Sequence, residues 1–212
     1  MTKIIIVRHG FSTSNKDGTF TGQMDAPLSD IGKKQAELVC EYIKNHYTVD
    51  EFYSSDLTRA VDTIKEVADY FGKSIHLEKG LREVDCGEWT GKKVDQVKDE
   101  FFEDFTRWKK GGEDSPMTGG ESMRQVKERA MTVINRMVKD CPNKTVVVAT
   151  HGGLIKTIQS GCLKIPYESL SSGWATNASI TEFNYDGEKF TLEKFSYDEY
   201  LGELTTTMPS GV

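Results

Sequence analysis

Two runs of apolar residues, one at the start of the chain and one in its second half, dominate the hydropathy pattern. Residues 3–8 and 144–149 contain the unbroken apolar runs Ile4–Val7 and Val146–Ala149, which are typical of strands buried on both faces of a sheet. The pair Asp186-Gly187 separates two alternating runs and predicts a hairpin turn. The pattern thus predicts strands over residues 3–8, 51–54, 74–78 and 144–149, and a hairpin over 178–195.

Between these strands the apolar positions recur with the period of an α-helix. In the first such stretch, Ala36, Val39 and Ile43 fall on one face, and Ser29 or Asp30 can cap its start. The other stretches follow the same pattern and lie between Gly-rich or polar segments. Helices are therefore predicted over residues 30–46, 57–71, 94–110, 121–140 and 153–162.

The order of these elements predicts the fold class. Strands that alternate with helices favour an α/β fold, a three-layer α/β/α sandwich with a mainly parallel central sheet. The pattern loosens over residues 80–93, which we expect to be a loop, and residues 84–140 read as a helical insertion over one edge of the sheet. We expect one domain over residues 1–212, with the last dozen residues frayed.

Composition and charge narrow the classes of function. The 212 residues include 37% hydrophobic and 28% charged ones, as in a globular protein. A net charge of −6 without a basic block argues against nucleic acid or an anionic membrane as the partner. The apolar runs are too short to cross a bilayer or to form a signal peptide, so we expect a cytoplasmic protein.

Cysteine and histidine spacing offers no metal site. The four cysteines show no CxxC spacing, so we expect buried reduced thiols, with disulfides as the lesser alternative. The four histidines are scattered, and no pair has the spacing of metal ligands. We therefore predict neither a metal nor another cofactor.

Basic side chains follow three of the predicted strands. Arg8 and His9 end the first strand, His151 follows the strand over 144–149, and Arg59 lies in the first turn of the helix after the second strand. Ligands of parallel α/β sheets bind at the carboxyl ends of the strands. Three separate segments should therefore bring these side chains to one edge of the sheet, the edge that the insertion would cover.

Such a cluster suits a tetrahedral oxyanion such as phosphate. The planar fork of Arg matches phosphate oxygens, and the backbone amides that open a helix at Gly152 favour an anion. A neutral histidine is a nucleophile toward phosphorus, and Arg8 beside His9 disfavours the imidazolium. Phosphoryl transfer also needs an acid for the leaving alkoxide, and Glu83, in the loop after the third short strand, is the candidate.

Simpler interpretations of these residues stay open. Arg8 with His9 also fits an idle, solvated pair at a strand end, although the matching place of His151 argues against it. Arg59 also fits a surface charge on an exposed helix. Glu83 also fits an ordinary loop charge.

Six motifs, in order, resemble one known family. They are VRHGFSTSN, TGQMDAPLSDIGKKQA, SSDLTRAVDT, LREVDCGEWTG, GGES and ATHGG. Together they resemble the histidine phosphatase superfamily, also called the phosphoglycerate mutase-like family, from about residue 3 to about residue 185. His9 resembles the family's nucleophile, which becomes phosphorylated, and Glu83 resembles its proton donor. The resemblance implies that Arg8, Arg59 and His151 complete the phosphate pocket.

The resemblance adds three residues from the segment after the first strand. Asn15 matches a residue that contacts phosphate, and Thr21 and Gly22 match a loop that lines the substrate. Asn15 also fits the cap of a short turn, and Thr21 with Gly22 also fits a simple turn. The implied mechanism is two in-line transfers, first to His9 and then to water, with no metal.

Departures from the family pattern separate the competing functions. The mutases of the family carry further basic residues after the glutamate, which this chain lacks, although Lys92 and Lys93 lie nearby. The resemblance therefore favours a metal-independent phosphomonoesterase for a small phosphorylated metabolite, with a phosphoglycerate mutase as the alternative. A regulatory module without turnover ranks last, since His9, Glu83 and His151 are all present. Neither the substrate nor the oligomeric state, monomer or homodimer, follows from the sequence.

Overall fold

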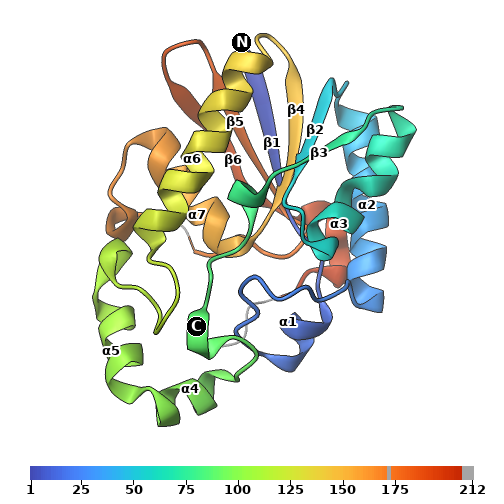
Figure 1. Cartoon of the computed structure of the whole chain (residues 1–212). Helices are drawn as coiled ribbons and strands as arrows, with labels where there is room; N and C mark the ends of the chain where they lie inside the picture. Colours follow the sequence, from blue (N-terminus) through green and yellow to red (C-terminus); the bar gives the residue numbers. More distant parts are fainter. Residues whose placement is uncertain (171–172, 207–212) are drawn as a thin grey trace.

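A six-stranded sheet forms the centre of the protein, whose computed structural model describes residues 1–170 and 173–206. The strands are β1 (Thr2–Arg8), β2 (Glu51–Ser54), β3 (Ile75–Leu77), β4 (Thr145–Thr150), β5 (Ile180–Tyr185) and β6 (Phe190–Tyr197). They lie in the order β3-β2-β4-β1-β5-β6 (Figure 1). The first four run parallel, and β5 and β6 are antiparallel to their neighbours. The predicted α/β fold with a mainly parallel sheet is confirmed.

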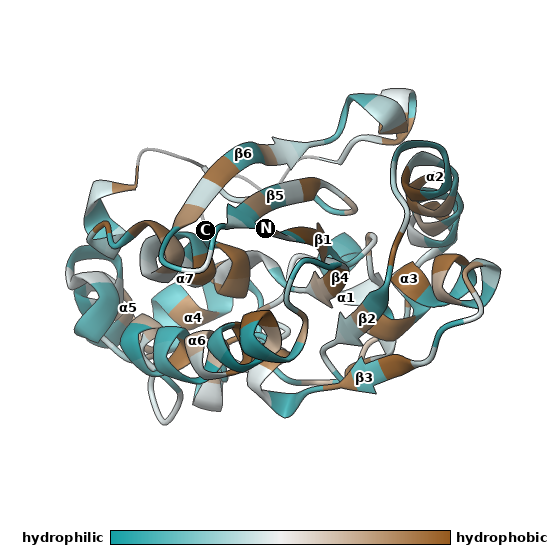
Figure 2. Ribbon diagram, turned by 90° about the horizontal axis from the view of Figure 1, so that it is seen from above, coloured by the Kyte–Doolittle hydropathy of each residue, from teal (hydrophilic) through white to brown (hydrophobic). Residues whose placement is uncertain are grey.

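Helices cover both faces of this sheet. They are α1 (Thr13–Asp17), α2 (Asp30–His46), α3 (Thr58–Tyr70), α4 (Val94–Glu100), α5 (Phe102–Lys110), α6 (Met123–Asp140) and α7 (Gly152–Leu163). Figure 2 looks along the layers: α2 and α3 lie on one side of the sheet, and α6 and α7 on the other. In the part of the chain that the structure describes, no helix is both long and apolar enough to cross a bilayer.

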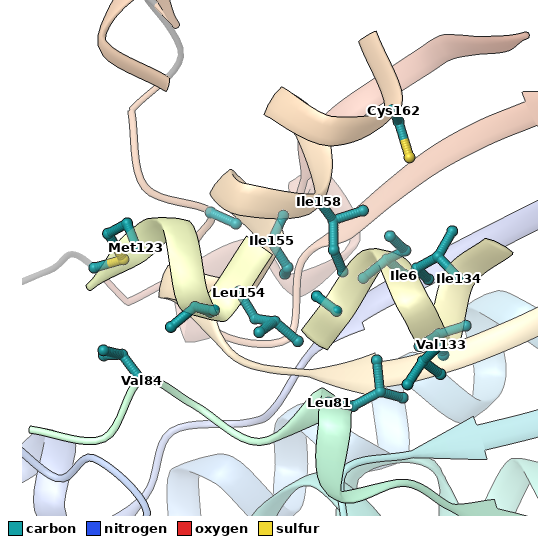
Figure 3. Close-up of a cluster of buried hydrophobic side chains, with 14 of the residues drawn as sticks. Ile6, Leu81, Val84, Met123, Val133, Ile134, Leu154, Ile155, Ile158 and Cys162 are labelled. Atoms are coloured by element: carbon teal, nitrogen blue, oxygen red, sulfur yellow. The ribbon is translucent and has the colours of Figure 1, made fainter. Parts of the chain in front are cut away.

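Two buried cores explain the unbroken apolar runs. In β1, Ile5 and Val7 pack toward α2 and α3, whereas Ile4 and Ile6 pack toward α6 and α7. Figure 3 shows Ile6 among side chains of α6 and α7. Successive side chains of a strand point to opposite faces, so a central strand covered on both sides must be apolar at every position. All four cysteines are buried free thiols, as predicted.

The region over residues 84–140 divides between two places in the fold. Helix α6 packs against α7 on the face of the sheet, as a helix of the main layers. Helices α4 and α5 instead lie beyond the carboxyl ends of the parallel strands (Figure 1). The part of the predicted insertion that stands off the sheet is therefore the segment with α4 and α5.

Several predicted boundaries were wrong. The helix predicted over 94–110 is two helices, since Phe101 leaves the helical conformation, and this bend lets Phe105 and Trp108 pack on Trp89. Helix α1, only five residues long, was not predicted. Residues 80–93 contain two short 3₁₀ turns, Lys79–Leu81 and Gly87–Trp89.

The expectation of a frayed end was also wrong for part of the last dozen residues. Glu199–Leu204 forms 3₁₀ turns, and the side chain of Leu201 is buried against the core beside α2. Residues 207–212 lie outside the described part of the chain.

Candidate active site

The parallel pairing of β1 and β4 places two histidines side by side. Arg8 pairs with Thr150 at the ends of the two strands, so the next residues, His9 and His151, leave the sheet together. The His9 backbone N–H donates to the Thr150 carbonyl at 2.9 Å. The centroids of the two imidazole rings are 5.0 Å apart. The two histidines therefore meet at one edge of the sheet, as predicted from the sequence.

His9 is held in one tautomer. Its Nδ1 lies 2.7 Å from the carbonyl oxygen of Gly10, which can only accept, so Nδ1 carries the proton and Nε2 keeps its lone pair. The ring is buried, and its pKa lies well below the ordinary value because of burial first and then the charges of Arg59 and Arg8. His9 is therefore neutral near pH 7, with one basic nitrogen available.

His151 is oriented by a serine from the neighbouring strand. Its Nε2 lies 2.9 Å from the Ser55 hydroxyl, which itself accepts the Leu57 backbone N–H at 3.3 Å. The Ser55 hydroxyl can then donate a hydrogen bond to Nε2 of His151. In that arrangement the ring proton of His151 is on Nδ1. Among the described residues, this buried Nδ1 has no hydrogen-bond partner. The pKa of His151 is also lowered well below its ordinary value, by burial and then by Arg59.

Two arginines flank the histidines. Arg8 donates from Nη1 to the Ala175 carbonyl at 2.5 Å, and burial lowers its pKa to about 10. Arg59 is 1% exposed, so the alternative of a surface charge is excluded. It donates to the carbonyl oxygens of Gly22 and Met24 at 2.9 and 2.8 Å. Both guanidinium groups remain charged at neutral pH, and their positive charges act on the ring of His9.

Glu83 meets the start of α7. One carboxylate oxygen accepts the Gly153 backbone N–H at 3.2 Å, and the other accepts the Val84 N–H at 2.9 Å. A Cβ on Gly153 would lie 2.6 Å from this carboxylate, so only glycine allows the approach. The carboxylate thus lines the same cavity as His9 and Arg8.

A partly buried clamp, formed by Arg129 and Glu121, holds the loop that carries Glu83. Arg129 of α6 makes five hydrogen bonds, three to the carbonyl oxygens of residues 80, 82 and 83 and two to the carboxylate of Glu121. Glu121 in turn accepts the Asp85 backbone N–H at 2.9 Å. The GGES motif therefore fastens the backbone on both sides of Glu83.

The segment after β1 forms another wall. Asn15 Oδ1 accepts from the Ser12 backbone N–H at 3.1 Å. Asn15 therefore helps to cap the short helix α1, in agreement with the capping role that its sequence also fits. Asn15 also borders the cavity with Thr21 and Gly22. Gly22 has φ +50°, and a Cβ there would press on Cys86. The capping and lining interpretations of Asn15 are thus compatible.

One cavity brings together eight of the nine residues singled out from the sequence. It is lined by Arg8, His9, Asn15, Thr21, Gly22, Arg59, Glu83 and Gly152. The ninth, His151, is fully buried and does not line the cavity, but its ring packs beside that of His9. Apolar side chains, among them Trp108, Met117 and Trp174, form the rest of the wall.

Sequence reasoning missed several residues around this cavity. Ser55 orients His151, Gly153 binds Glu83, and Asn177 donates to the His9 carbonyl at 3.0 Å. Ser55 directly follows β2. Because it lies at the end of a parallel strand, like His9 and His151, its position in the sequence could have indicated a residue of the site. Asn177 and Arg129 carry no local signal of this kind. Lys92 pairs with Glu100 at 2.6 Å and is not one of the residues that line the cavity.

The described residues contain no group of three or more His, Cys, Asp or Glu side chains placed to hold a metal ion. A neutral imidazole between two buried guanidinium groups, beside a carboxylate, is the arrangement of an enzyme that handles phosphate esters.

Comparison with known proteins places the chain in a family. Residues 4–198 match the model of the histidine phosphatase superfamily (branch 1), and the chain belongs to this superfamily. Phosphoserine phosphatase 1 of Hydrogenobacter thermophilus is 31% identical over 204 residues, 96% of each chain. The chain is a phosphoric monoester hydrolase of this superfamily.

Two solved structures share the fold closely. A mycobacterial glucosyl-3-phosphoglycerate phosphatase in complex with VO₃ has a TM-score of 0.85 and 27% identity, over 92% of this chain and 99% of its own. A phosphoserine phosphatase from Entamoeba histolytica, in complex with 3-phosphoglyceric acid, has a TM-score of 0.82 and 30% identity, over 95% and 100%.

Proposed function

We propose that the protein hydrolyses a small phosphorylated metabolite without a metal, through a phosphohistidine intermediate on His9. The observation that carries this proposal is the state of His9: a buried, neutral ring whose Nδ1 is held by Gly10, so that Nε2 is the nucleophile. The arginines on either side supply the charge that a phosphoryl group needs. The relatives named as phosphoserine and glucosyl-3-phosphoglycerate phosphatases support a phosphate ester of a small organic acid as substrate.

In the first step His9 Nε2 attacks phosphorus in line with the leaving oxygen. The P–N bond forms as the P–O bond breaks, and Glu83 gives its proton to the departing alkoxide. Arg8, Arg59 and the Nδ1–H of His151 would hold the equatorial oxygens. Asn15, Thr21 and Gly22 would border the bound ester, as the sequence resemblance implies, and so would Gly152 at the start of α7.

In the second step water replaces the histidine. Glu83, now a carboxylate, takes a proton from water, whose oxygen attacks phosphorus as the P–N bond breaks. The electron pair of that bond returns to His9 Nε2, and inorganic phosphate leaves. Both steps use the same carboxylate, so its position relative to His9 decides both rates.

Metal removal gives the first test. Phosphate release from a panel of phosphomonoesters should be unchanged in excess chelator, because the charges that stabilise the transition state belong to side chains. Phosphate is measured directly, and 3-phosphoglycerate is included with its 2-isomer followed alongside. Release that stops on chelation would contradict the proposal. Interconversion of the two isomers without release would instead establish the mutase alternative.

Arg129 should act as a positioning residue for Glu83. Arg129→Lys keeps the charge but cannot reproduce a fork with five hydrogen bonds, so the loop around Glu83 should lose its fixed place. We expect kcat to fall about 10- to 100-fold on alkyl phosphates and much less on aryl phosphates, whose leaving groups need little protonation.

Arg136→Lys is the matched control for that variant. Arg136 lies on the same helix and pairs with Glu78 at an exposed site, so its replacement should leave both substrates unaffected. Equal losses of Arg129→Lys on alkyl and aryl phosphates would mean that Arg129 supports the fold and does not position the acid.

A further inference from the structure

A second cavity adjoins the phosphate site on the side of α5 and α7. The side chains of Trp108, Met123 and Trp174 line both cavities, so the two share a wall. The second cavity is also lined by three lysines, Lys109, Lys110 and Lys156, and by one carboxylate, Glu168. Its lining is therefore basic, in a protein whose net charge is −6.

Lys156 is the lysine that the structure places most firmly. It is half-buried on α7, four residues after Gly152 and three after Gly153, and therefore on the same face of the helix as the two glycines. Its ammonium lies 4.7 Å from the ring centroid of Tyr167 and 5.5 Å from that of Trp174. Two aromatic faces thus hold the charge in place by cation–π contact.

Among the described residues, no carboxylate forms an ion pair with the ammonium of Lys156. Glu168, which lines the same cavity, accepts the Glu113 backbone N–H at 2.7 Å instead. Burial lowers the pKa of Lys156, against the opposing effect of Glu168. A half-buried cation without a counter-ion carries a desolvation cost that an anionic ligand would offset.

We propose that Lys156 binds a second anionic group, a carboxylate or a second phosphate, on the alcohol part of the substrate. This inference rests on the proposed function, because it places the transferred phosphate beside His9. The substrate is then a phosphomonoester with two anionic ends, one in each cavity, and its carbon skeleton contacts Trp108, Met123 and Trp174.

The spacing along α7 suits a short skeleton. Lys156 lies four positions after Gly152 along the helix, a rise of about 6 Å. The ammonium can therefore reach an anionic group a few bonds from the phosphate ester. Lys92 and Lys93, the lysines that follow Glu83 in the sequence, line neither cavity.

Matched pairs of substrates test the role of Lys156. We would measure kcat/KM for 3-phosphoglycerate against glycerol 3-phosphate, for phosphoserine against phosphoethanolamine, and for a sugar bisphosphate against its monophosphate, with p-nitrophenyl phosphate as a reference. The wild-type protein should prefer the doubly anionic member of at least one pair. Lys156→Met should lower kcat/KM for that member about 10- to 100-fold, mainly through KM, and leave the others within about twofold.

Methionine keeps the apolar stem against Tyr167 and Trp174, so the variant should fold, and thermal unfolding checks that it does. Lys156→Arg should retain the preference, and Lys139→Met, an exposed lysine of α6, should change nothing. The pair that loses its preference identifies the anion as carboxylate or phosphate.

Two results would overturn the proposal: no preference in the wild-type protein, or an equal loss of activity on every substrate including p-nitrophenyl phosphate. Failure of the proposed function looks different. In that case the wild-type protein releases no phosphate from any substrate, p-nitrophenyl phosphate included.

Discussion

Replacing His9 by alanine should abolish phosphate release, with a loss of kcat of at least about 10³-fold on every phosphomonoester. The proposed covalent step needs the lone pair on Nε2. The other imidazole that the described residues place beside it, that of His151, has its Nε2 engaged by the Ser55 hydroxyl. The decisive measurement is rapid acid-free quenching with phosphorus-labelled substrate, which should trap an alkali-stable, acid-labile phosphoenzyme in the wild-type protein and none in His9→Ala.

His76→Ala is the matched control for this variant. His76 is an exposed histidine at the far edge of the sheet, on β3, and its replacement should change neither turnover nor labelling. Labelled His9→Ala protein would place the phosphoryl group on another residue. Full turnover without any trapped intermediate in the wild-type protein, under single-turnover conditions, would argue for direct attack by water.

Glu83→Gln should separate substrates by their leaving groups. Glutamine keeps the shape of the side chain and can still accept the Gly153 N–H, but it cannot supply a proton. Alkyl phosphates should lose about 10²- to 10⁴-fold in kcat, and p-nitrophenyl phosphate much less, because its phenolate leaves without protonation. The measurement is kcat for a series of esters ordered by the pKa of the alcohol, which should show a steeper dependence in the variant.

An exposed neighbour in the same loop serves as the control for Glu83. Glu88→Gln changes a carboxylate that does not line the phosphate cavity, and its rates should match the wild-type protein. If Glu83→Gln lost the same factor on alkyl and aryl esters, Glu83 would not be the acid. Its contact with α7 would then serve only to hold the loop.

Local pattern was a good guide to the sheet and its ends. The run Ile4–Val7 is apolar at every position because both faces of β1 are covered, and that demand is visible in the sequence. Arg8, His9 and His151 follow such runs directly, so their place at one edge follows from strand direction alone. The grouping of Arg59 with them also follows, because it begins the helix after a parallel strand.

Other parts of the site depend on contacts between distant segments. The break at Phe101 accompanies packing on Trp89, and the period of apolar residues over 94–110 does not show it. In the sequence, Arg129 and Glu121 look like ordinary charged residues of a helix. Their contacts with the loop of Glu83 appear only in the tertiary structure, where α6 lies beside that loop. A hydrogen-bonded clamp of this kind has no signature at fixed sequence spacing.

The amino-acid pattern alone thus determined the class of fold, the edge that carries the site, and the residues at the strand ends, since these follow from burial and from strand direction. The tertiary structure decided the tautomer of His9, the contact of His151 with Ser55, the burial of Arg59, the clamp on Glu83 and the cage around Lys156. These features depend on which side chains meet across the fold, and hydrogen bonds, desolvation and cation–π contacts act only at such short distances.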